Sequence, residues 1–135
     1  MDEKLAALWA DWEKRPFQWG AADCTTFARD AVFRVHGIVV DCPVYINERD
    51  ALRLLSDHFR GWCLALRNAG FELVGSLPGV ARRGDLVLYE SEAPGLFPNG
   101  LAVCFGGKAY CPGESGLAEI PPAQWRQVWS PKAVK

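Results

Sequence analysis

The chain has 135 residues, half of them hydrophobic and six of them tryptophan, which is typical of one folded domain and excludes a disordered chain. Fifteen basic residues and sixteen acidic residues give a formal net charge of -1, and no block of like charge indicates a nucleic-acid or anionic-membrane surface. The longest apolar runs, such as 37–40 and 101–105, are far too short to span a bilayer. The acidic start of the chain has no cleavable apolar segment, so we expect the protein to fold in the cytosol.

Five cysteines, at positions 24, 42, 63, 104 and 111, make an odd number without any C-x-x-C pair. A disulfide framework is therefore not expected in a reducing compartment. Neither histidine lies at a zinc-ligand spacing from Cys104 and Cys111, so we expect no metal and no cofactor. Most of these thiols are expected to pack as small hydrophobic groups.

The first helix is predicted from apolar residues at positions 5, 8, 9 and 12, which recur at helical spacing and define one face. Proline disfavours helical geometry in the residue before it, so this helix is expected to end near Arg15, ahead of Pro16. The helical spacing also places Trp9 and Trp12 in the core.

A second helix is predicted to begin at Cys24, directly after a short loop. Asp23 stands where an N-cap is expected, and Gly37 is a natural stop after about Val35. Two more helical stretches are expected, one starting near residue 48 and a shorter one over residues 62–70.

After residue 70 the pattern changes to short strand-like runs separated by glycine and proline. These runs are FELVGSL, GDLVLYES, GLAVCFGG, KAYCP and LAEIPP, and AQWRQVW closes the chain as a last turn or strand. Helices first and an antiparallel sheet afterwards predict a single α+β domain over residues 1–135.

The order of elements, with a cysteine that opens an early helix ahead of a sheet, resembles the papain-like fold and, more narrowly, the NlpC-type cell-wall peptidases. Three stretches carry the likeness: FQWGAADCTTF, RRGDLVLYE and LAVCFGGKAYCPGESGL. In the same order, they resemble the family's loop with the Asp-Cys that starts the central helix, its first core strand, and the hairpin that follows that strand. The likeness covers about residues 16–129, after an N-terminal amphipathic helix. It implies N-terminal helices packed on a small antiparallel β-sheet.

The whole pattern most resembles a divergent branch of that superfamily that is encoded among bacteriophage tail genes. Its members combine a WG..DC..F entry, a GD strand, a GE.GL turn and a closing Trp-Arg. In this chain the motifs are Trp19-Gly20, Asp23-Cys24, Phe27, Gly84-Asp85, Gly113-Glu114, Gly116-Leu117 and Trp125-Arg126. The resemblance implies a tail-tip or tail-assembly protein, made in the cytoplasm of a bacterial host and carried in the virion tail. Its implied partners are other tail-tip or baseplate proteins, with peptidoglycan as a further candidate.

Cys24 is the candidate nucleophile, because a helix N-terminus can lower a cysteine pKa and a thiolate attacks amides. The resemblance implies that Trp19, Gly20 and Asp23 line a cleft beside it. A nucleophilic thiol also needs a base, which a further polar group must orient.

In NlpC-type enzymes the base is a histidine at the start of the hairpin's first strand. Alignment on this likeness places Gly100 or Leu101 there, and the orienting position falls near Cys111 or Pro112. No histidine base is therefore identified, which implies that the domain is catalytically impaired. The alternative for Cys24 is a half-buried thiol that packs the start of the helix.

The other polar candidates are weaker. His36 lies twelve residues after Cys24 on the same predicted helix, about 18 Å away, which is too far for proton transfer. Nothing places His58 at the cleft. Asp23 is expected to cap the helix, and Asp85 to stabilise a turn. The PGESGL stretch is explained by a tight glycine turn as well as by an anion site.

Three functions follow from these observations. The first is a tail-tip or tail-assembly protein without peptidase activity. The second is a cysteine peptidoglycan endopeptidase with Cys24 as nucleophile and an unrecognised base. The third is a cell-wall binding module that keeps the cleft but not the chemistry.

Overall fold

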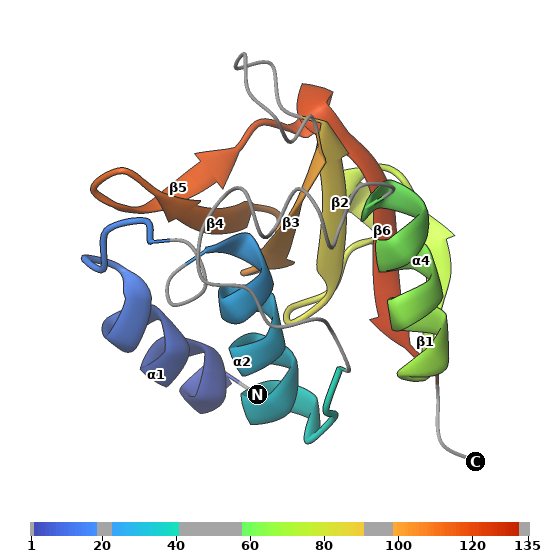
Figure 1. The fold of residues 1–135 in the computed structure, drawn as a ribbon, viewed down its shortest axis with the longest axis horizontal. Helices are drawn as coiled ribbons and strands as arrows, with labels where there is room; N and C mark the ends of the chain where they lie inside the picture. Colours follow the sequence, from blue (N-terminus) through green and yellow to red (C-terminus); the bar gives the residue numbers. More distant parts are fainter. Residues whose placement is uncertain (1, 19–22, 41–57, 91–98, 133–135) are drawn as a thin grey trace.

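The computed structural model describes residues 2–18, 23–40, 58–90 and 99–132, which form helices packed on an antiparallel sheet (Figure 1). The predicted α+β class is therefore confirmed. In this part of the chain, no helix is long and apolar enough to cross a membrane.

Helix α1 (Asp2–Trp12) ends three residues earlier than the sequence predicts. Residues 13 and 14 form a turn instead, in which the amide of Arg15 donates to the carbonyl of Trp12 over 3.1 Å. The Arg15 guanidinium then stacks over the Trp12 ring, 4.2 Å from its centroid. Trp12 is buried as predicted, whereas Trp9 is only half-buried and packs edge-on against Phe105.

Helix α2 (Cys24–His36) has the predicted ends at both termini. Asp23 is its N-cap and forms a reciprocal capping box with Thr26. Gly37 adopts a left-handed conformation with φ 69° and ends the helix.

Helix α4 (His58–Asn68) begins earlier than the predicted helix over 62–70, and Gly70 follows it with φ 92°. The helical region expected from residue 48 lies mostly outside the described residues.

All five predicted strands are present, and the closing segment is a sixth. The sheet has the order β1-β6-β2-β3-β4-β5 with antiparallel pairing throughout. The last strand thus lies between the first and the second, which chain order alone does not indicate. The bounds are β1 (Phe71–Gly75), β2 (Leu86–Glu90), β3 (Asn99–Cys104), β4 (Ala109–Gly113), β5 (Gly116–Ile120) and β6 (Trp125–Pro131).

The buried residues form two clusters because successive residues of a strand point to opposite faces. One cluster joins the helices to the sheet and includes Phe27 of α2, Leu101 of β3 and Trp129 of β6. The other cluster consists of strand residues that alternate with those of the first cluster, and it includes Ala102 and Cys111. Figure 1 shows α1 and α2 side by side near β3 and β4, and α4 against β1. Helix α2 thus brings its N-terminus to the strands that carry the candidate site.

Candidate functional site

Cys24 is the first residue of α2 and lies where the two core clusters meet, since it packs against both. The preceding Asp23 is fully buried, and its Oδ1 accepts from the amide of Thr26 over 2.9 Å. In return, the Thr26 hydroxyl accepts from the Asp23 amide over 2.8 Å. The Asp23 carboxylate is thus used for capping, as the sequence predicts, and points into the helix start.

The electrostatic surroundings of Cys24 favour the neutral thiol. Although the residue keeps partial exposure, its sulfur lies deep between helix and sheet, and burial raises the pKa of Cys24 from 9.0 to about 12. A hydrogen bond from the backbone of Leu101 acts in the opposite direction, while the nearby Cys111 and Asp23 raise the pKa further. Loss of hydration is thus the largest effect on the pKa of this thiol.

A tyrosine that sequence reasoning missed completes this site. Tyr89 on β2 is the cross-strand partner of Gly100 on β3. Its hydroxyl lies 3.2 Å from the sulfur of Cys111, and either atom can donate the hydrogen bond. Burial raises the pKa of Tyr89, and the neighbouring Cys111 and Cys24 add to the effect. No local sequence signal indicates Tyr89, because its pairing with Gly100 depends on the register between β2 and β3.

The positions that the resemblance assigns to a base and its orienting group hold neither an imidazole nor a carboxylate. Gly100 has no side chain, and Leu101 is a buried core residue. Cys111 and Pro112 occupy the corresponding part of β4. The described neighbours that act on the Cys24 sulfur are thus the Leu101 amide, the Thr25 hydroxyl, a second thiol, a carboxylate used for capping and a phenol, and none of them is an imidazole.

The remaining sequence candidates lie elsewhere. His36 is the last residue of α2, and its Nε2 donates to the carbonyl of Gly84 over 3.0 Å. His58 begins α4, but its side chain lies outside the described residues, as do Trp19 and Gly20. The structure therefore places His36 at the far end of the helix from Cys24, as predicted.

The family model described as Domain of unknown function (DUF6950) matches residues 1–131 of the chain. The chain belongs to this family. No curated protein and no solved structure matches it.

The Gly84-Asp85 motif of this DUF6950 domain stabilises a turn, as predicted. Asp85 is almost fully buried, and its Oδ2 accepts from the amide of Arg82 over 2.8 Å. Its pKa is raised, chiefly by burial, although the Ser130 hydroxyl and the Arg82 amide donate to it. The motif thus joins the start of β2 to β6 and, through Gly84, to the end of α2.

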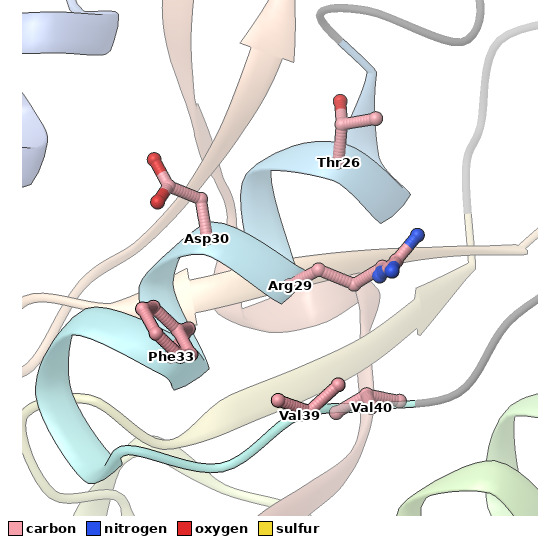
Figure 2. A pocket seen from close by; sticks show the side chains of 6 residues that line it. All are labelled: Thr26, Arg29, Asp30, Phe33, Val39 and Val40. Carbon is pink, nitrogen blue, oxygen red and sulfur yellow. The ribbon is translucent and has the colours of Figure 1, made fainter.

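The DUF6950 domain also has a hollow of about 310 Å³ along α2, away from the Cys24 sulfur (Figure 2). Figure 2 shows Arg29 and Phe33 of α2 on the side of Val39 and Val40, which follow the helix, whereas the side chains of Thr26 and Asp30 point away from these valines. Two of the polar lining residues already serve the fold, since Thr26 belongs to the capping box and Asp30 binds Arg34 over 2.9 Å. The hollow is lined by Thr26, Arg29, Asp30, Phe33, Val39 and Val40.

Within the described ranges of the DUF6950 domain, no group of three or more His, Cys, Asp or Glu side chains could hold a metal ion.

Proposed function

We propose that this DUF6950 domain is a component or assembly factor of a bacteriophage tail tip, built on an NlpC-like fold and without peptidase activity. The proposal rests on the phage-tail motifs of the sequence together with one structural observation. That observation is the environment of Cys24, whose sulfur is buried beside a phenol and a second thiol. In this role Cys24 packs the start of α2 against both core clusters.

The chemistry of thiol catalysis supports this reading. Attack on an amide requires a thiolate and a group that takes the proton from sulfur. A pKa of about 12 keeps Cys24 protonated at neutral pH. The Asp23 carboxylate caps the helix, with its Oδ1 accepting from the Thr26 amide.

An exposed apolar surface beside the hollow of Figure 2 supports a role in assembly. Phe33 is 59% exposed and Val39 is 70% exposed, although both are large hydrophobic residues. Arg29 lies between them and the start of α2, and it forms no ion pair with the residues described here. A partner segment that combines an apolar side chain with a carboxylate complements this surface, and we assign it to a neighbouring tail protein.

The test uses the phage or prophage that encodes the chain. Deletion of the gene should abolish infectious particles, whereas Cys24→Ala should leave the titre and tail morphology unchanged. Infectious particles that assemble normally without the protein would contradict the tail role. A loss of infectivity in Cys24→Ala, with normal folding of the purified variant, would contradict the packing role of the thiol.

A matched pair of surface variants tests the assembly surface. Phe33→Ser should reduce the yield of complete tails, because it removes an exposed apolar contact. Leu77→Ser is the control, since Leu77 is 66% exposed and follows β1, away from the hollow. Both purified variants should unfold at the wild-type temperature. Equal tail yields from the two variants would refute this surface as the contact site.

The second candidate function is a cysteine peptidoglycan endopeptidase, and one contact favours it. The backbone of Leu101 hydrogen-bonds the Cys24 sulfur at a helix N-terminus, and both features stabilise a thiolate. This function predicts release of peptide fragments from purified cell wall, with loss of release in Cys24→Ala. Sedimentation with insoluble peptidoglycan without turnover, equal in wild type and Cys24→Ala, would instead indicate a binding module.

A further inference from the structure

We propose that Tyr89 is the residue that holds this thiol site in its inactive form: its ring fills the space over Gly100 and places a hydroxyl, instead of a proton acceptor, beside the sulfur atoms. Tyr89 is thus a positioning residue that acts through Cys24. The inference deepens the non-catalytic part of the proposed function, and it does not depend on the phage-tail role.

The first observation is steric. A Cβ added at Gly100 would collide with the hydroxyl and the ring of Tyr89, with the ring Cε1 at 2.8 Å. Real Cβ atoms essentially never approach another atom that closely, so a side chain at position 100 requires Tyr89 to move. Since the two residues face each other across β2 and β3, the tyrosine occupies the volume that any residue at position 100 would need.

The second observation concerns reach. The backbone of Leu101, the next residue along β3, hydrogen-bonds the Cys24 sulfur. The Cβ direction at Gly100 points to the Tyr89 hydroxyl, which itself lies 3.2 Å from the Cys111 sulfur. A longer side chain at position 100 would therefore extend along the path that the tyrosine now takes, toward the two thiols.

The third observation is chemical. Tyr89 is half-buried, and its phenol is surrounded by protein rather than water. A phenol is protonated at neutral pH, and the raised pKa of Tyr89 keeps it protonated at higher pH as well, so it cannot accept the Cys24 proton. An imidazole in the same space can accept that proton. The product would be a thiolate and an imidazolium, with the proton moved from sulfur to nitrogen and no other reactant needed.

The experiment exchanges the two residues and measures the reactivity of Cys24. Tyr89→Ala combined with Gly100→His removes the ring and adds an imidazole, and Tyr89→Ala combined with Gly100→Gln is the matched control without a base. The rate of iodoacetamide alkylation at Cys24 is measured from pH 5 to pH 10 by site-resolved mass spectrometry. The histidine variant should react at least about tenfold faster than the glutamine variant at pH 7, with a rate that follows an imidazole titration.

Single variants separate the steric and chemical parts of the inference. Gly100→His alone should lower the unfolding temperature strongly, because Tyr89 blocks the site. Gly107→His should not, since no atom lies within 4 Å of a Cβ at Gly107. Tyr89→Phe keeps the ring and should leave Cys24 as unreactive as in the wild type.

Equal alkylation rates of Cys24 in the histidine and glutamine double variants would overturn the inference. An unfolding temperature of Gly100→His equal to that of the wild type would overturn it as well. If both double variants fail to fold, Tyr89→Ala alone decides: alkylation of its Cys24 no faster than in the wild type would also overturn the inference. A wild-type Cys24 that already reacts rapidly at pH 7 would contradict the proposed non-catalytic function instead.

Discussion

Replacing Gly116 with alanine should destabilise the domain, because this glycine is where the β4–β5 hairpin meets the chain after α1. Gly116 has φ +127°, a conformation that residues with a side chain rarely adopt. Its added Cβ would collide with the carbonyl oxygen of Glu13 and approach the Lys14 Cα to 3.2 Å. The same Glu13 carbonyl accepts from the amide of Leu117 over 3.1 Å.

The magnitude follows from these contacts. The unfavourable backbone conformation costs about 1–2 kcal/mol, and displacement of Glu13 weakens a hydrogen bond that contributes about 1 kcal/mol. The variant should therefore lose about 2–3 kcal/mol in the free energy of unfolding, which corresponds to about 7–10 °C in Tm. Urea unfolding followed by circular dichroism measures the first quantity, and a thermal scan measures the second.

Gly79→Ala is the matched control for this experiment. No atom lies within 4 Å of a Cβ at Gly79, and its φ is not in the left-handed region. The control should change the free energy of unfolding by less than about 0.5 kcal/mol. If Gly116→Ala is as stable as Gly79→Ala, the hairpin does not dock on the chain after α1 as described. The close approach of Glu13 also explains why Gly116 of the PGESGL stretch is a glycine, and this explanation requires no bound anion.

Two further predictions concern ionisation. Site-resolved alkylation of the wild-type protein at pH 8 should modify Cys63 before Cys24. Burial raises the pKa of both thiols, but the charge of Arg67 acts against this rise at Cys63, whereas the pKa of Cys24 reaches about 12. Faster labelling of Cys24 would contradict its burial. Asp85→Asn tests the buried carboxyl, whose raised pKa means that the folded state keeps its proton to higher pH than the unfolded state. The free energy of unfolding of the wild type should therefore fall relative to that of Asp85→Asn as pH rises from 3.8 toward the raised pKa. Urea unfolding at a series of pH values measures both free energies. A constant difference between the two proteins would refute the raised pKa of Asp85.

The local structure of the domain could be predicted because short-range signals decide it. The capping box at Asp23 and the left-handed Gly37 depend on residues within a few positions of each helix end. The strands follow from short apolar runs between glycines and prolines. The end of α1 was predicted less well, because the chain turns after Trp12 and lets Arg15 stack on that ring.

The candidate site was only partly predictable. The sequence indicated Cys24, its cap, the glycine at position 100 and the distance of His36 from the cysteine. It did not indicate Tyr89, because the contact of that residue with Gly100 and Cys111 depends on the register between β2 and β3. A register is set by packing across the whole sheet, and a shift of one residue would turn Tyr89 to the other face.

By itself, then, the sequence determined the α+β class, the strands, both ends of α2 and the position of the thiol at the start of that helix. Only the tertiary structure decided that β6 lies between β1 and β2 and that the Cys24 sulfur is deeply buried beside a phenol. The physical reason is that helix ends and turns depend on neighbours in the chain, whereas the hydration of a thiol depends on residues that folding brings from far along it. At Cys24 the loss of hydration is the largest effect on the pKa, and the thiol stays protonated at neutral pH.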